Sequence, residues 1–360
     1  MKRYRTRQKI FLLSSILLLL ACQIPTSPGL SVLVPTASET PTASATPSLT
    51  QTATQAPTLT ATASPTAPQT ETPTQTPSPI VTSTFALPAR RVVIVSIDGL
   101  RPDAVFPSSM SNLITLMQTG AFSLGAQTVF PSVTLVAHAS MLSGVCPSKH
   151  GLLWNEYLPE RGYAPGTDLF DLAHAAGLKT IMYVSSNKLR QIVEAASIDR
   201  FIYIEDRDSV IMGSLVSHFP EDFGLLFVHL VATDIAGHDA GWMSQHQSHT
   251  IHLADEALGM LLAELDARNL RGETLIIVTS DHGGYGGGHG TNVREDMTIP
   301  WVISGPGIQP KTLTTPVHIM DTAATAAFAL GLPIPADWDG VPVYEAFGLP
   351  VERQSVPCQQ

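Results

Sequence analysis

Basic residues are scarce and unevenly placed in this chain of 360 residues. Five of the 20 Lys and Arg residues stand among the first nine positions, and the next is Arg90. Acidic residues show the opposite bias, so that residues 90–360 carry a formal charge of −13. Because a protein that holds nucleic acid by its phosphates needs a basic face, nucleic-acid binding is not expected. Clustered carboxylates suit bound cations instead.

The chain begins with an apolar run, 10–20, that is too short to span a bilayer, which takes about 20 apolar residues. Basic residues precede the run and a small residue follows it, which predicts a secretory signal peptide over residues 1–21. Residues 19–22 (LLAC) resemble the bacterial lipobox, which implies cleavage before Cys22 and lipidation of its thiol. The expected location is the outer face of a bacterial cell membrane or the cell surface, with a lipid anchor. An ordinary signal peptide followed by an incidental Cys is the alternative.

Residues 22–88 have almost no charge and no periodic apolar face, and consist largely of Thr, Pro, Ser and Ala. Such a segment cannot bury enough apolar surface to offset the entropy lost on ordering it. Its proline content favours extended conformations. We therefore expect a stalk that holds a folded domain, residues 89–348, away from a membrane, with a short tail at 349–360.

Cysteine is rare, and beyond Cys22 only Cys146 and Cys358 remain. An exported protein meets the oxidising conditions in which these two can pair. The position of Cys358 in a tail that we expect to fray favours the other interpretation. We therefore predict that Cys146 is an unpaired, buried thiol that packs as a small hydrophobic residue.

Apolar runs typical of buried strands alternate with helical patterns in residues 89–348. The predicted strands are 91–97, 179–184, 223–230, 274–279 and 299–303, and the predicted helices are 109–119, 168–176, 244–268 and 318–330. We expect Thr167 to cap the second of these helices. The alternation predicts an α/β fold with a mostly parallel central sheet and helices on both faces.

Carboxylates follow three of the predicted strands. Asp98 follows the first, Asp234 the third and Asp281 the fourth. Three histidines stand at short spacings after the last two of these: His238, His282 and His289. Because the carboxyl ends of parallel strands meet at one edge of a sheet, we expect all six side chains to converge there. One zinc ion takes about four ligands, so the set predicts two metal ions, an arrangement that recurs in phosphoryl chemistry.

Thr134 is the candidate nucleophile. It opens a predicted helix that runs to Leu142, and free N–H groups at a helix N-terminus attract phosphate oxygens. Coordination by a metal ion would lower the pKa of its hydroxyl group and activate it. A threonine in this position is also a common helix cap, so the residue alone does not decide between the two roles.

These motifs together resemble the nucleotide pyrophosphatase/phosphodiesterase branch of the alkaline phosphatase superfamily, over essentially all of residues 89–348. The segment IVSIDGLRPD around Asp98 is similar to the first metal motif of that family. The segments TDIAGH and SDHGG are similar to its Asp-x-x-x-His and Asp-His metal pairs. The run SGVCPSKHG after Thr134 is similar to the run that follows the family's Thr nucleophile.

The resemblance implies an alkaline-phosphatase-like fold and a two-step hydrolysis of phosphodiester or phosphoanhydride bonds in a small-molecule phosphate ester. Thr134 would form a phosphothreonine intermediate, while Asn155 would contact a non-bridging phosphate oxygen. One metal ion would take Asp234, His238 and His289. The other would take Asp98, Thr134, Asp281 and His282. Both ions are usually zinc in the family, although His and Asp ligands accept several metals.

Three absences narrow the expected substrate. The sulfatase signature, Cys or Ser followed by x-Pro-x-Arg, is missing around Thr134, which disfavours sulfate esters. No Arg stands near Thr134 in the sequence to bind a doubly charged monoester, which favours diesters. The loop before His289 is short, whereas nucleotide-preferring members insert a long segment there, so nucleotides are not singled out. Phosphomonoesters, phosphonates and phospholipid head groups stay open as substrates. A non-catalytic surface binding module is the alternative of another class, and the oligomeric state is left open.

Overall fold

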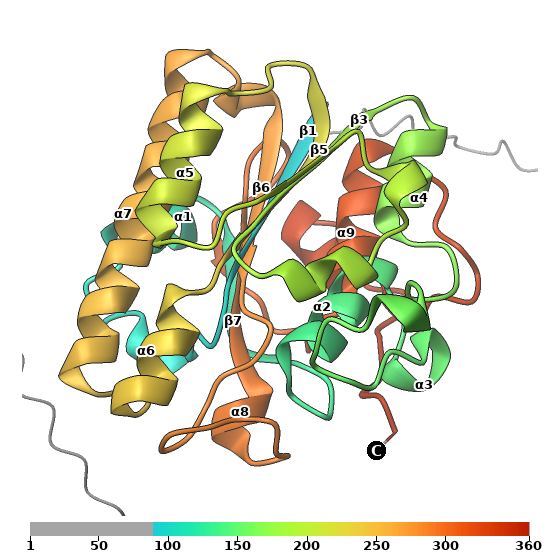
Figure 1. The fold of residues 1–360 in the computed structure, drawn as a ribbon. Helices are drawn as coiled ribbons and strands as arrows, with labels where there is room; N and C mark the ends of the chain where they lie inside the picture. The colour runs from blue at the N-terminus through green and yellow to red at the C-terminus, as the bar shows by residue number, and fades with distance from the viewer. Residues whose placement is uncertain (1–88, 360) are drawn as a thin grey trace, which may run out of the picture. The chain divides into compact units, whose positions relative to one another are not determined.

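The computed structural model describes residues 89–359, so the predicted signal peptide, Cys22 and the predicted stalk lie outside the described residues. An eight-stranded sheet carries helices on both faces (Figure 1). The strand order is β4-β3-β5-β1-β6-β7-β2-β8. The predicted α/β class with a mostly parallel sheet is confirmed.

The central strands of the sheet are apolar runs that are buried on both faces. The bounds are β1 Arg91–Ile97, β2 Ala121–Gln127, β3 Lys179–Val184, β4 Arg200–Tyr203, β5 Phe223–Leu230, β6 Thr274–Thr279, β7 Thr298–Ser304 and β8 Lys311–Thr312. Strand β1 lies between β5 and β6 and is parallel to both. Strand β7 is antiparallel to β6 and to β2. The sequence did not predict β2, whose Ser and Gly residues hide the strand pattern; its pairing with β7 supplies the stability that propensity does not.

Two sets of helices cover the two faces of the sheet, with α1, α5, α6 and α7 on one side and α2, α3, α4 and α9 on the other (Figure 1). The bounds are α1 Ser111–Thr119, α2 Thr134–Ser143, α3 Pro147–His150, α4 Leu169–Ala175, α5 Asp208–Ser217, α6 Ala232–Ala240, α7 Gln245–Ala267, α8 Arg294–Met297 and α9 Asp321–Leu330. Each face has its own hydrophobic cluster, because alternate side chains of β1 point in opposite directions. Val92 and Ile94 belong to one cluster, and Val93 and Val95 to the other.

Helix α4 begins differently from the prediction, because Asp168 and not Thr167 is its N-cap. The Asp168 carboxylate accepts hydrogen bonds from the N–H groups of Phe170 and Asp171. The Asp171 carboxylate in turn accepts from the N–H of Asp168, which completes a capping box. An Asp side chain satisfies the free N–H groups at a helix start as well as a Thr does.

The prediction of an unpaired Cys146 is wrong, because Cys146 and Cys358 form a disulfide. The tail is held a second time by Ser355, which is buried. The Ser355 hydroxyl donates to the Asp321 carboxylate at 2.7 Å and accepts from His318 Nδ1 at 2.7 Å. The expected fraying of the tail therefore does not occur at these residues. The two cysteines are 212 positions apart, so local sequence gave no sign that they meet.

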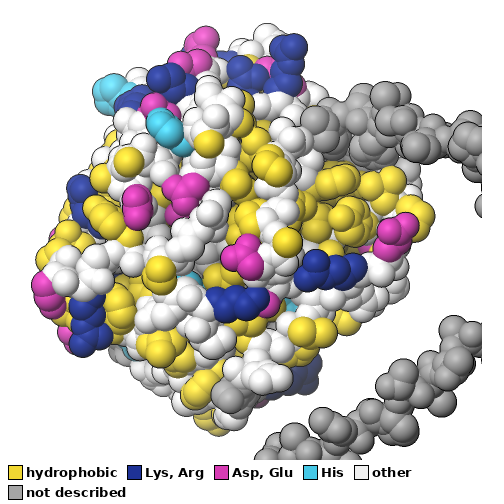
Figure 2. All heavy atoms as spheres, turned by 90° about the vertical axis from the view of Figure 1, so that its right-hand side faces the viewer, with side chains coloured by type: hydrophobic (Ala, Val, Ile, Leu, Met, Phe, Trp, Pro, Cys, Tyr) yellow, Lys and Arg dark blue, Asp and Glu magenta, His cyan; other side chains and the backbone are white. Residues whose placement is uncertain are grey.

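The surface over α4 and α9 carries mixed charge. On the face drawn in Figure 2, Lys and Arg side chains are interspersed with acidic and hydrophobic ones. This face therefore offers no continuous basic area of the kind that binds a nucleic-acid backbone. Within residues 89–359, none of the helices is both long enough and apolar enough to cross a membrane.

Candidate active site and metal centre

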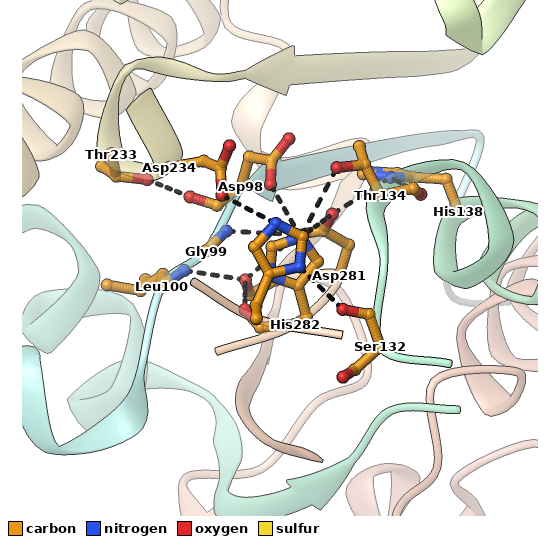
Figure 3. A network of polar contacts seen from close by, with 12 residues as sticks. Asp98, Gly99, Leu100, Ser132, Thr134, His138, Thr233, Asp234, Asp281 and His282 are labelled. Atoms are coloured by element: carbon orange, nitrogen blue, oxygen red, sulfur yellow. Dashed lines mark hydrogen bonds and ion pairs between the residues drawn. The ribbon is translucent and has the colours of Figure 1, made fainter. Parts of the chain in front are cut away.

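The segments that follow β1, β5 and β6 bring Asp98, Asp234, Asp281 and His282 together (Figure 3). Asp98 directly follows β1, and Asp281 stands two residues after β6. Strand β5 leads into α6, which carries Asp234 and His238 one helical turn apart. Gly99 permits the close approach of these segments, since it has a φ of +71° and a Cβ there would lie 3.2 Å from the Asp234 Cα atom.

Asp98, Asp281 and His282 form what we call the inner group, and all three side chains are buried. The Nε2 atom of His282 lies 3.3 Å from Asp98 Oδ1 and 3.2 Å from Asp281 Oδ2. Thr134, the first residue of α2, is also buried, and its hydroxyl oxygen lies 3.5 Å from His282 Nε2. The predicted nucleophile thus sits against the inner group.

Asp234, His238 and His289 form the outer group. Asp234 Oδ1 lies 3.6 Å from His238 Nε2 and 3.5 Å from His289 Nε2. The side chain of His238 is 44% exposed, which makes it the most accessible member. Ligand atoms of Asp98, Asp234 and His282 also lie within 4.8 Å of one another, so Asp234 joins the outer group to the inner one.

The three histidines present the same ring nitrogen to the site. In each, Nδ1 donates a hydrogen bond to a backbone carbonyl, which leaves Nε2 with a lone pair directed at the carboxylates. The accepting carbonyls are Gly283 for His282 at 2.8 Å, Ser132 for His289 at 2.9 Å and Gly287 for His238 at 3.0 Å. This tautomer is the one that a metal-binding imidazole requires.

Each of the three carboxylates has a buried oxygen without a hydrogen-bond partner: Asp98 Oδ1, Asp234 Oδ1 and Asp281 Oδ2. These are the same oxygens that lie near the histidine Nε2 atoms. The lone pairs of these oxygens therefore face the lone pairs of the Nε2 atoms. A buried oxygen without a hydrogen-bond partner destabilises the folded state. A divalent cation would satisfy both kinds of ligand, so this donor set fits bound metal ions.

The titration of the inner group leads to the same conclusion. Burial, with a further contribution from Asp281, raises the pKa of Asp98 to about 7. Burial, followed by the charge of Asp234, raises the pKa of Asp281 to about 7. Burial lowers the pKa of His282 to about 4, which keeps its imidazole neutral and able to bind a metal. A divalent cation bound between these carboxylates would favour their charged forms.

His229 supports Asp98 from β5, a contact that the sequence did not reveal. Its Nε2 lies 2.9 Å from Asp98 Oδ2, and its Nδ1 lies 3.3 Å from the hydroxyl of Ser185. Burial lowers the pKa of His229 to about 3, so the neutral ring donates from Nε2 and fixes the Asp98 carboxylate. The available signal was a polar residue within the otherwise apolar run FGLLFVHL.

His138 and His150 brace helix α2 and hold no free ligand atom. His138 donates from Nδ1 to the carbonyl of Thr134 at 2.7 Å, and its Nε2 lies 2.8 Å from the hydroxyl of Ser96. His150 places Nε2 3.0 Å from the hydroxyl of Ser140, while its Nδ1 accepts the N–H of Leu152. Because both ring nitrogens of each residue are engaged, His138 and His150 hold helix α2 in place.

Asn155 lies beside the start of helix α2, and it has a partner that the sequence did not suggest. Its side-chain oxygen accepts the N–H of Leu135, the residue after Thr134, at 3.0 Å. The same oxygen accepts from Nζ of Lys188 at 3.1 Å. Lys188 follows Asn155 by 33 positions, on the short 3-10 helix Asn187–Gln191 after β3. A basic side chain is therefore close to Thr134 in space, although no Arg is close in sequence.

Two solved structures illustrate the fold that this chain shares with other proteins. An inactive variant of murine ectonucleotide pyrophosphatase/phosphodiesterase 5, solved with AMP, has a TM-score of 0.62 at 15% identity, over 72% of this chain and 99% of that one. The phosphonate monoester hydrolase of Agrobacterium radiobacter has a TM-score of 0.60 at 13% identity, over 74% of this chain and 78% of that one. At such identities the likeness establishes the fold, and it confirms the predicted alkaline-phosphatase-like architecture.

The family follows from the sequence match. Residues 92–175 and 178–287, more than half of the chain, match the family described as type I phosphodiesterase/nucleotide pyrophosphatase, and the chain belongs to this family. Human GPI ethanolamine phosphate transferase 2 is 27% identical over 73% of this chain and 29% of its own length. Rat ectonucleotide pyrophosphatase/phosphodiesterase family member 3 is 25% identical over 53% of this chain and 24% of its own length. The chain thus spans less than a third of these two relatives.

Proposed function

We propose that this chain hydrolyses phosphodiester or phosphoanhydride bonds in small-molecule phosphate esters, at a site for two divalent metal ions. One observation carries the proposal. Three buried carboxylates, each with an unpartnered oxygen, face three imidazole Nε2 atoms beside the hydroxyl of Thr134. Membership of a family of phosphodiesterases and pyrophosphatases supports it.

The inner group, with Thr134, would hold one ion, and the outer group would hold the other. When bound, the ions, which we propose are zinc, supply charge that stabilises phosphate oxygens and activates a hydroxyl group. His229 and the carbonyls that accept from the histidine Nδ1 atoms keep the ligands oriented. Loss of hydrogen bonds that orient metal ligands in this way typically weakens metal binding by about 10- to 100-fold.

Thr134 is the proposed nucleophile. Its Oγ1 atom forms a bond to phosphorus while the bond to the leaving oxygen breaks, which gives a phosphothreonine. A water oxygen then forms the new bond to phosphorus as the bond to Oγ1 breaks, which releases the product and restores the hydroxyl. The buried position at the start of α2, braced by His138, fixes the attacking oxygen. Asn155 has its oxygen engaged, so its Nδ2 group is the donor left for a non-bridging oxygen.

The test uses the full-length chain, purified without chelator and assayed on bis-p-nitrophenyl phosphate. We expect hydrolysis that a chelator abolishes and that added zinc or manganese restores. Elemental analysis of the same preparation gives the metal content. A preparation with two metal ions per chain that hydrolyses neither this diester nor p-nitrophenyl phosphate would favour a non-catalytic binding module.

We further propose that the protein is exported and anchored to the outer face of the membrane by a lipid on Cys22. The Cys146–Cys358 disulfide supports export, because such bonds persist in oxidising compartments. In cells that make the full chain, we expect the protein in the membrane fraction and the Cys22→Ser variant outside it. Equal distribution of the two proteins would contradict the anchor.

A further inference from the structure

We propose that Lys188 binds a non-bridging oxygen of the substrate's phosphoryl group and allows the site to accept doubly charged phosphoryl groups, as in monoesters or phosphonates. This inference rests on the proposed function and adds a specificity residue to it. It also extends the expected substrates beyond the diesters that the missing Arg favoured, since the fold brings a cation to the site from a distant segment.

The position of Lys188 follows from the topology. Strand β3 is parallel to β5, which is parallel to β1, so the segment after β3 emerges at the edge of the sheet where Asp98 lies. The half-buried Lys188 stands four residues after β3, and its Nζ donates to Asn155 Oδ1 at 3.1 Å. That oxygen also accepts from the N–H of Leu135, so the ammonium group is two hydrogen bonds from the residue next to Thr134.

The partner of Lys188 sets it apart from the other lysines of residues 89–359. Lys149, Lys179 and Lys311 lie within 2.6, 3.5 and 3.2 Å, respectively, of carboxylate oxygens of Asp339, Asp199 and Glu345. Within the same residues, Lys188 has no carboxylate at ion-pair distance and is bonded to a neutral amide oxygen. An ammonium group has three donors, so this contact leaves two for an anion. A half-buried ammonium group that has no carboxylate at ion-pair distance and two free donors can bind a phosphate oxygen.

Charge balance explains why the effect should depend on the substrate. Two divalent cations are offset by the carboxylates of Asp98, Asp234 and Asp281 and by an ionised Thr134, which leaves the centre close to neutral. A diester adds one negative charge and a monoester adds two. The single positive charge of Lys188 neutralises the one negative charge of a bound diester. It neutralises only one of the two negative charges of a bound monoester. Because charge interactions strengthen in a partly buried site, loss of this cation should harm the monoester more.

The experiment compares Lys188→Met with the full-length wild-type chain on p-nitrophenyl phosphate and on bis-p-nitrophenyl phosphate. We expect kcat/KM to fall about 10- to 100-fold for the monoester and by no more than about threefold for the diester. The fall for the monoester corresponds to the loss of one hydrogen bond to a charged group, which costs about 10- to 100-fold. Lys188→Arg should restore most of the monoester activity. Lys179→Met is the matched control, because it removes a lysine from the opposite end of β3 and should change neither value.

A second readout does not depend on turnover. Inorganic phosphate binding is measured by calorimetry on the metal-loaded Thr134→Ala chain and on the same chain with Lys188→Met. We expect phosphate to bind about tenfold or more weakly without Lys188. Equal losses for both esters, together with unchanged phosphate binding, would show that Lys188 only positions Asn155, and would overturn the inference. If the wild-type chain hydrolyses neither ester, the proposed function fails, whereas the phosphate measurement still decides the role of Lys188.

Discussion

The inner and outer groups offer similar ligands in different surroundings. The inner carboxylates and imidazole have almost no exposed surface, and His229 and Thr134 close the shell around them. The outer group includes the half-exposed His238 and rests against the Gly-rich loop of residues 283–288. Because these surroundings differ, the two metal ions that we propose for the site would not exchange alike. We expect the inner ion to be retained and the outer one to exchange with solvent.

Close packing determines the shape of the loop beside the outer group. A Cβ atom at Gly284 would lie 2.1 Å from the Trp242 ring, so only glycine fits at this position. Trp242 in turn donates from its indole nitrogen to the carbonyl of Gly99, next to Asp98. Trp242 therefore contacts both the loop beside the outer group and the segment that carries Asp98 of the inner group.

The largest effect is expected from the inner group, with Asp98→Asn. This change removes a charge that lies between His229 and His282, so turnover should fall by about 1,000-fold or more, and added metal should not restore it. Steady-state kinetics and elemental analysis provide the measurement. Asp103→Asn, in the same motif but exposed and paired with Arg101, is the control and should stay within about threefold of wild type. More than a tenth of wild-type turnover in Asp98→Asn would contradict the ranking.

A smaller and reversible effect is expected from the outer group, with His238→Ala. Loss of one exposed ligand should weaken metal binding by about 10- to 100-fold, so activity should return when metal is added in excess. Titration of the chelated variant with zinc measures this. His246→Ala, an exposed histidine on α7, should titrate as the wild type does. If excess metal did not restore the activity of His238→Ala, the expected difference in metal exchange between the inner and outer groups would be wrong.

Metal binding should strengthen as the pH rises through about 7. The pKa values of Asp98 and Asp281 are raised to about 7 in the metal-free fold, so protons compete with the metal below that pH. In the metal-free protein, the raised pKa of these carboxyl groups stabilises the fold below pH 4, and this stability is lost as the pH rises to 7. A bound metal ion keeps the carboxylates ionised, so the stability that it adds increases over the same pH range. The pKa of His282 is lowered to about 4, so this residue stays neutral from pH 5.5 to 8.

Thermal unfolding tests this pH dependence. The difference in Tm between metal-loaded and chelated protein should grow by roughly 5–10 °C between pH 5.5 and pH 8. A difference that shrinks with rising pH would contradict the assignment of these carboxylates as ligands.

The smallest effect on activity is expected from Cys358→Ser, which leaves both groups in place. The disulfide joins the tail to the residue that precedes α3, so its loss should destabilise the fold by about 2–5 kcal/mol while kcat stays within about twofold. Denaturant unfolding and the diester assay measure the two quantities. A large loss of kcat would mean that the tail acts on the site directly.

The site was predictable where its residues stand next to strong local signals. Asp98, Asp234 and Asp281 follow apolar runs, and parallel strands must end at one edge. His229 and Lys188 were not predictable in this way, because their roles depend on which strands neighbour β1 and on contacts across the sheet. The disulfide was missed for the same reason, since packing of the tail is a long-range property.

The most direct test of the central claim is the Thr134→Ala variant of the full-length chain, measured for metal content and diester turnover together. We expect two metal ions per chain, as in the wild type, with turnover lowered by at least about 10,000-fold, which is the scale on which loss of a nucleophile acts. Wild-type turnover in this variant would show that Thr134 is not the nucleophile. Absence of bound metal from the active wild-type chain would show that the centre does not work as proposed.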